Sequence, residues 1–230
     1  MDISGQVFRR SARMGILYVA IGVVMAVAVS ATLDFATGVV NTQGASAKGV
    51  DIAGALGMIS IPFAALGGLV VTTPVYLLFV SDKNEGVLEY LLAVGMGQRD
   101  VFAGYLKAAL ALAMVAVVPA VAINLALAPN GMAVALEGAG LSLLTAVADV
   151  SLVTVLMTSF SSMQRRPTGM NSPLGISIGI FSLLPELMLF AVLGTAILWL
   201  DLFIAVAVSV VALGLLLSLD RLIRREKLLP

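Results

Sequence analysis

The sequence predicts an all-α integral membrane protein with six transmembrane helices, and three observations carry that prediction. Of its 230 residues, 60% are hydrophobic and 11% are charged, and the mean hydropathy is +1.10. Soluble domains are roughly half apolar and about a quarter charged. The core of one soluble domain of this size cannot bury the additional hydrophobic residues. Apolar runs long enough to cross a bilayer recur along the chain, and basic residues fall between alternate runs.

The predicted spans are apolar runs bounded by charged residues or turns. A membrane helix needs about 20 mostly apolar residues. By that criterion the six spans cover 14–33, 52–80, 101–128, 133–162, 174–194 and 201–219. The small, polar segment 34–51 is expected to be an outer loop. A count of five or seven spans would require merging or splitting the stretch 174–219.

The second span contains residues that affect helix geometry. Pro62 and Pro74 predict kinks in it. Four glycines in the same span permit close contact with another helix, namely Gly54, Gly57, Gly67 and Gly68. The sequence does not indicate which helix that is.

The distribution of basic residues predicts the orientation of the spans. Six spans place both ends of the chain on one side of the membrane, and all of the 13 basic residues except Lys48 fall on that side. Because basic residues favour the cytosolic face, we predict that both termini are cytosolic, with a basic tail at 220–230.

Two residue types are missing altogether, and their absence narrows the chemistry. The sequence contains no Cys and no His. This excludes disulfides, thiolate or imidazole zinc sites, His-ligated haem, and Ser-His or Cys-His nucleophile pairs. We therefore expect this chain to be no enzyme and to hold no cofactor or metal. The net charge is zero, so charge gives no indication of nucleic-acid binding, and we expect none.

The cytosolic loop 82–100 contains a short amphipathic helix. Apolar side chains recur in it at helical spacing, namely Val87, Leu88, Leu91 and Leu92. Glu85 and Glu89 stand four residues apart on another face, Gly95 breaks the helix, and Asp100 can cap the next one. Such a helix can transmit force at the membrane interface or simply rest there, and periodicity leaves both interpretations open.

The sequence of this loop resembles the first cytosolic loop of the ABC type-2 exporter permeases. That family typically reads acidic-x-Gly-[Thr/Val]-Leu-Glu-x-Leu-Leu, and residues 84–92 match it closely. The chain length, the six spans and the basic tail are also similar. The sequence departs from the family in three respects. Gly95 stands where proline is common, Gly104 and Lys107 are not adjacent, and the segment between spans five and six is short.

The resemblance implies a permease subunit in the inner membrane of a prokaryotic cell. Such permeases pair as homodimers or heterodimers, and each sits on a cytosolic ATP-binding cassette subunit that holds ATP and magnesium. This chain has no Gly-x-x-x-x-Gly-Lys-[Ser/Thr] loop, so a separate polypeptide must bind the nucleotide. The coupling helix would be 85–94, with the ATPase-coupling residues Glu85, Gly86, Leu88, Glu89, Leu91 and Leu92.

The resemblance also places the N-terminal segment 1–13 along the inner membrane face, in contact with lipid. There, an apolar patch would consist of Ile3, Val7 and Phe8. The basic side chains that would face lipid phosphates are Arg9, Arg10 and Arg13.

Three charged residues inside the predicted spans are candidates for a translocation path or a dimer seam. Asp149 lies roughly 22 Å from the outer end of span four, where an ionised carboxylate costs about 2.5–3.5 kcal/mol. It must therefore be paired, protonated or in contact with water. Lys107 lies at a suitable depth to pair with it, and a hydrogen bond to Thr145 or Ser151 is the structural alternative. Glu186 follows a proline, which favours a kink over catalysis.

Two other interpretations stay open. The first is a haem-exporter membrane subunit of cytochrome maturation, which is similar in length and has an Asp-x-x-x-Gly-x-Leu-Glu loop. In that subunit a characteristic turn follows span four, and residues 164–169 of this chain match that turn only loosely. The second is a non-transport polytopic membrane protein or an intramembrane enzyme. The sequence lacks Ser-His, His-Glu zinc and Gly-x-Gly-Asp motifs, and Asp149 is the one feature that favours an enzyme.

Overall fold

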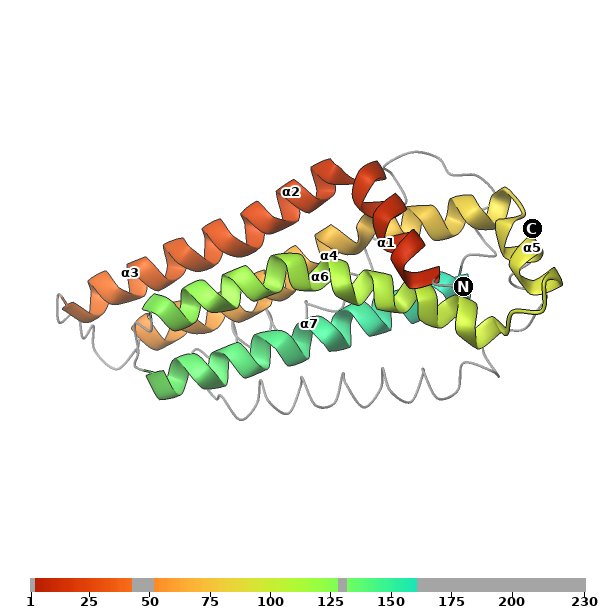
Figure 1. Ribbon diagram of the computed structural model, residues 1–230. Helices are drawn as coiled ribbons and strands as arrows, with labels where there is room; N and C mark the ends of the chain where they lie inside the picture. The colour runs from red at the N-terminus through yellow and green to blue at the C-terminus, as the bar shows by residue number, and fades with distance from the viewer. Residues whose placement is uncertain (1–2, 43–51, 128–131, 161–230) are drawn as a thin grey trace.

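The computed structural model describes residues 3–42, 52–127 and 132–160, and this part of the chain consists of helices without a strand (Figure 1). In chain order the elements are α1 (Ile3–Met14), α2 (Ile16–Val24), the π-helical turn η1 (Met25–Val29), α3 (Ser30–Thr42), α4 (Ile52–Asn84), α5 (Val87–Ala93), α6 (Gln98–Leu127) and α7 (Met132–Phe160). The all-α prediction is confirmed for these residues. Two described stretches, Ile16–Ala36 and Gln98–Leu127, are long and apolar enough to cross a membrane.

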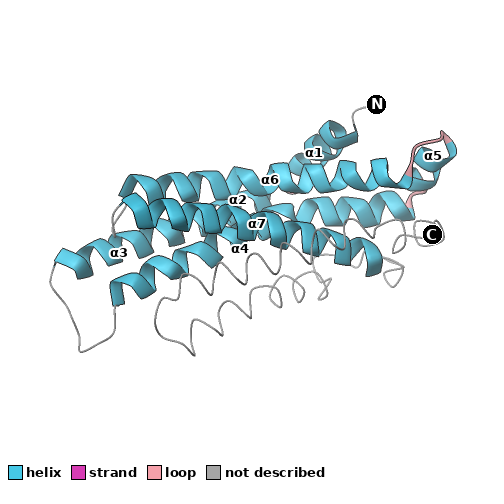
Figure 2. Cartoon of the chain, turned by 90° about the horizontal axis from the view of Figure 1, so that it is seen from below, coloured by secondary structure: helices cyan, strands magenta, loops and turns pink. Residues whose placement is uncertain are grey.

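The long helices lie side by side in an elongated bundle (Figures 1 and 2). α4 is central, because it packs against α2, α3, α6 and α7. α1 crosses α6 and α4 near one end of the bundle, and α5 lies at that same end (Figure 1). The buried core between these helices is made mainly of Ala, Val and Leu side chains. Small side chains of this kind allow helices to approach closely.

The observed helices differ from the predicted spans mainly at their ends. α4 begins at the predicted residue and continues to Asn84, and Pro62 and Pro74 lie within this one helix. α6 begins three residues before 101, and α7 covers 132–160 against a predicted 133–162. Spans five and six, Glu186 and the tail 220–230 lie outside the described residues.

The first helical stretch extends further than predicted. α2, η1 and α3 follow one another without a break from Ile16 to Thr42, so the expected outer loop at 34–51 is helical over 34–42. Asp34, the first residue of that predicted loop, is a buried residue inside α3. Next to the π-helical turn, the Thr32 hydroxyl is 2.9 Å from the carbonyl oxygens of both Ala28 and Val29. The hydroxyl therefore donates a hydrogen bond to backbone carbonyl oxygens at the point where the regular helical hydrogen-bond pattern is interrupted.

Glycines bring α4 into close contact with two neighbours. A Cβ atom at Gly67 would lie 2.6 Å from the Cβ of Ala26 in η1 and 2.6 Å from the carbonyl oxygen of Gly22 in α2. A Cβ atom at Gly68 would lie 2.9 Å from Val117 of α6. The sequence did not indicate the helices that these two glycines contact. In the structure, Gly67 contacts the continuous α2–η1 stretch, and Gly68 contacts α6.

Candidate coupling site

The short helix predicted in the loop after span two is present as α5, at one end of the bundle (Figure 1). α4 ends at Asn84, and Gly86 then turns the chain with φ +74° and ψ +9° before α5 begins at Val87. At the other end, Gly95 has φ +92°. The backbone N–H groups of Gly95 and Met96 donate to the carbonyls of Leu92 and Leu91, at 3.1 Å each. This pair of bonds closes the helix as a Schellman motif.

One face of α5 is buried and the other is exposed. Leu88 and Leu91 are buried in the core that the long helices share. On the outer face, Glu89 is exposed, and so are Tyr90 (65%) and Val94 (63%). Two large apolar side chains beside a carboxylate form a surface suited to a protein contact. We call these residues, Glu89, Tyr90 and Val94, the outer face of α5.

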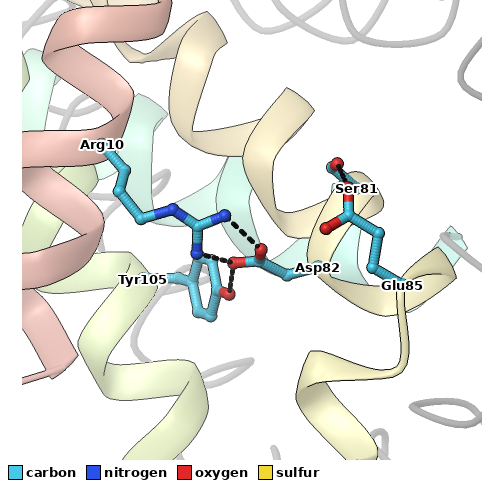
Figure 3. A network of polar contacts seen from close by, with 5 residues as sticks. All are labelled: Arg10, Ser81, Asp82, Glu85 and Tyr105. Atoms are coloured by element: carbon cyan, nitrogen blue, oxygen red, sulfur yellow. Dashed lines mark hydrogen bonds and ion pairs between the residues drawn. The ribbon is translucent and has the colours of Figure 1, made fainter.

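The six predicted coupling residues therefore divide by position. Leu88 and Leu91 anchor α5 in the bundle, whereas Gly86 and Leu92 are half-buried. Glu85 is exposed, but the hydroxyl of Ser81, on the last turn of α4, donates a hydrogen bond of 2.6 Å to its Oε1 (Figure 3). Glu89 makes no hydrogen bond or ion pair within the part of the chain that the structure describes, which leaves its carboxylate available to a partner.

Beside α5, Asp82 joins three helices (Figure 3). Its Oδ1 lies 3.0 Å from Nη2 of Arg10 on α1, and its Oδ2 lies 3.3 Å from Nη1 of the same guanidinium. The hydroxyl of Tyr105 on α6 donates a hydrogen bond of 2.5 Å to Oδ2. The Tyr105 ring in turn packs edge-on against Phe79 of α4, with ring centroids 5.1 Å apart and planes at 89°. Asp82 is thus the point where α1, α4 and α6 are tied together next to α5.

The apolar side of segment 1–13 packs against the bundle. Ile3 and Val7 are buried in the core that the long helices share. A Cβ atom at Gly104 of α6 would lie 2.7 Å from Cγ2 of Ile3, so Gly104 provides the space for this contact. Phe8 is half-buried against the same core. Of the three arginines expected to face lipid phosphates, Arg10 binds Asp82, whereas Arg9 and Arg13 are exposed.

This network was not predicted, because Asp82 was considered only as the first residue of the cytosolic loop 82–100. A signal was nevertheless present: an acidic residue ends a predicted span on the same side of the membrane as three N-terminal arginines. Opposite charges at the same depth are candidates for pairing. The identity of the partner helix is a tertiary property that neither periodicity nor composition contains.

The basic residues of the described part all lie toward the α1 and α5 end of the bundle. They are Arg9, Arg10 and Arg13 on α1, Lys83 at the end of α4, and Arg99 and Lys107 early in α6. Lys83 is buried, and this burial lowers the pKa of its ammonium group. These six basic residues therefore gather toward one end of the bundle.

Of the three candidate path residues, Asp149 and Lys107 lie in the described part, and the two are not paired there. Asp149 is fully buried in α7, whereas Lys107 is exposed on α6, and no ion pair joins them. Neither carboxylate oxygen of Asp149 has a hydrogen-bond partner there, so the alternative of a bond to Thr145 or Ser151 is not observed. Glu186 lies outside the described residues. Among the residues described, no cluster of three or more acidic, His or Cys side chains could hold a metal ion.

Comparison of the chain with protein-family models, with curated proteins and with solved structures finds no match in any of the three. A functional interpretation therefore depends on the motif at 84–92 and on the geometry around α5.

Proposed function

We propose that this chain is the membrane permease subunit of an ATP-driven ABC exporter, moved by a separate ATPase that docks on α5. The observation that carries the proposal is the two-sided packing of α5. Its inner leucines, Leu88 and Leu91, are buried in the core of the bundle, while Glu89, Tyr90 and Val94 are exposed. A helix built this way can receive a partner on one side and pass a displacement to the bundle on the other.

The surface of the bundle supports a location in the membrane. Large apolar side chains are exposed along the α2–η1–α3 rod and on α6 and α7, including Ile16, Leu17, Val24, Phe35, Val118 and Leu136. Lipid tails accommodate exposed apolar side chains such as these, whereas extended apolar surface is rare on soluble monomers. Together with the two long apolar helices, this favours the multi-pass arrangement that the sequence predicts.

The basic end of the bundle supports the orientation. Arginine and lysine side chains gather where α1 and α5 lie, and such residues favour the cytosolic face. In this orientation α5 faces the cytosol, where a nucleotide-binding subunit is available. We place the protein in the inner membrane of a prokaryotic cell, paired with a second permease of the same or a different sequence.

The Asp82 network gives the coupling a mechanical route. α5 contacts α4 and α6, and Asp82 ties the end of α4 to α1 and α6 through Arg10 and Tyr105. A push on α5 therefore acts on a connected set of helix ends rather than on a free loop. The ATPase supplies the energy by hydrolysing ATP with magnesium, and this chain converts its movement into a rearrangement of the bundle.

The test is purification of the tagged full chain from its native membranes in mild detergent. We expect an ATP-binding cassette subunit to co-purify, identified by mass spectrometry. Glu89→Lys reverses the charge of the outer face of α5 and should reduce ATPase recovery and transport. The matched control is Met132→Lys, which places the same side chain at an exposed position at the opposite end of the bundle. Equal behaviour of the two variants, or the absence of any ATPase, would contradict the proposal.

A further inference from the structure

A buried polar seam lies between α4 and α7, away from the coupling site. Thr72 and Tyr76 come from α4, and Asp149 and Thr154 come from α7. All four side chains are buried, and both carboxylate oxygens of Asp149 are without a hydrogen-bond partner in the described part of the chain. A buried carboxylate that is ionised and unpaired is among the most costly groups a protein can hold. The form in which Asp149 exists therefore needs a physical explanation.

The neighbouring hydroxyl groups use their protons elsewhere. Thr72 donates to the carbonyl of Leu69 at 2.7 Å, and Thr154 donates to the carbonyl of Val150 at 2.6 Å. The hydroxyl of Tyr76 lies 3.1 Å from Thr72 Oγ1 and 3.3 Å from Thr154 Oγ1. Each hydroxyl has one proton to donate. Because both threonines use that proton in the shorter bond to a backbone carbonyl, the Tyr76 hydroxyl donates its own proton to a threonine oxygen. These three hydroxyls thus have no proton to offer Asp149.

No cation compensates Asp149 among the described residues either. Of the titratable side chains of α4, Tyr76 bonds to Thr72 and Thr154, whereas Asp82 and Lys83 lie more than one helical turn further along, at the end of the helix. α6 also packs against α7, and its titratable side chains lie elsewhere: Tyr105 bonds to Asp82, while Arg99, Asp100 and Lys107 are exposed. On α7 itself, Glu137 is more than three helical turns away. Among residues 3–42, 52–127 and 132–160, the closed seam therefore contains neither a donor nor a counter-charge for an ionised Asp149.

We infer that Asp149 is a proton-binding site, occupied by a proton when the seam between α4 and α7 is closed. A proton neutralises the carboxylate without needing additional space or additional ligands. A sodium ion would need several oxygen atoms arranged around it, and the hydroxyls here bond to one another and to the backbone. Loss of the proton creates a charge that the closed seam cannot hold, so release of the proton is linked to separation of α4 from α7. This inference depends only on the seam and requires no ATPase.

The experiment uses the purified full-length chain in detergent and the apolar carbodiimide N,N′-dicyclohexylcarbodiimide, which modifies protonated carboxyl groups in apolar surroundings. We expect peptide mass spectrometry to find the adduct on Asp149 at neutral pH. The yield should fall as the pH is raised, by about tenfold for each unit above the midpoint. Asp149→Asn should lose this adduct, and the exposed Glu89 serves as the internal control that stays unmodified.

A second measurement does not depend on reactivity. The neutral amide of Asp149→Asn resembles the protonated acid, so this variant should keep its fold. The thermal stability of the unmodified chain should decline as the pH rises, because the folded state holds a proton that the unfolded state has released. That decline should be weaker in Asp149→Asn. An Asp149 that stays unmodified at every pH, or that sodium protects at constant pH, would overturn the inference.

Discussion

Arg10 and Asp82 lie 72 residues apart in the sequence, yet they form a two-point ion pair with N–O distances of 3.0 and 3.3 Å. The Asp82 side chain is 2% exposed, whereas that of Arg10 is 49% exposed. The carboxylate thus depends on Arg10 for its charge compensation, while the guanidinium keeps its contact with solvent. Since Asp82 precedes α5 by only a few residues, the N-terminal helix α1 is part of the support on which α5 rests.

We predict that Arg10→Ala destabilises the bundle by about 1–3 kcal/mol. The range lies between the roughly 0–1 kcal/mol of a surface pair and the 3–5 kcal/mol of breaking a buried one, because Arg10 itself is half-exposed. Thermal unfolding of the purified chain in detergent measures the change. Arg9→Ala is the matched control, because Arg9 is an exposed neighbour on α1, and it should change stability by no more than about 0.5 kcal/mol.

A double-mutant cycle tests whether the effect belongs to the ion pair. We expect Asp82→Asn to make the loss of Arg10 less costly, because the charge that Arg10 compensates is then gone. The destabilisation in Arg10→Ala with Asp82→Asn should therefore be smaller than the sum of the two single changes. Additive losses would show that Arg10 contributes through packing of its side chain alone.

Tyr105 provides a second, separable contribution at the same carboxylate. Tyr105→Phe removes the hydrogen bond to Asp82 but retains the edge-on contact with Phe79, so we predict a loss of about 1.5–3 kcal/mol. Tyr90→Phe is the control, because Tyr90 is exposed on α5, and it should leave stability unchanged. The measurement is again thermal unfolding. An effect of Tyr105→Phe no larger than that of Tyr90→Phe would mean that the hydroxyl is replaceable by water.

The features that could be predicted from the sequence are those that local physics determines. The helices follow from long apolar runs, and α5 follows from leucines at helical spacing between Gly86 and Gly95, whose positive φ angles no other residue adopts as easily. The same helical spacing predicts which residues of α5 lie on its outer face.

Pairings between distant helices could not be predicted in the same way. Arg10 was expected to face lipid and residue 82 to begin a loop, because each charge was considered without knowledge of the helix beside it. An outer loop was expected to begin at residue 34, yet the helix continues through Asp34 to Thr42. Asp149 was recognised as needing a partner, but only the packing of α4 against α7 reveals that it has none among the described residues.

The contact between α4 and the α2–η1 rod predicts a strong size limit at Gly67. Gly67→Ala adds a Cβ atom 2.6 Å from both Ala26 and the Gly22 carbonyl, so a helix must shift. Overpacking of this kind costs about 1–3 kcal/mol, which exceeds the gain in helix propensity of about 1 kcal/mol. Gly140→Ala is the control, because no atom lies within 4 Å of the added Cβ there, and it should stabilise α7 slightly. Opposite signs in thermal unfolding would support the contact, and equal signs would refute it.

The turn at Gly86 predicts a separation of stability from coupling. Gly86 has φ +74°, and an alanine in this left-handed conformation costs roughly 1–2 kcal/mol. Alanine also favours helix, so Gly86→Ala encourages α4 to continue into α5 and to turn the outer face of α5 away from its partner. Asparagine adopts the left-handed conformation more readily, so Gly86→Asn should retain the turn.

We therefore expect Gly86→Ala to reduce ATPase stimulation in the co-purified complex severalfold, and Gly86→Asn to recover most of it. Circular dichroism of each variant checks that the bundle remains helical, so that a change in coupling is not mistaken for unfolding. The comparison depends on backbone geometry, since neither side chain extends far enough to replace a contact of Glu89 or Tyr90. If asparagine and alanine reduce the stimulation equally, the left-handed turn is not what positions α5.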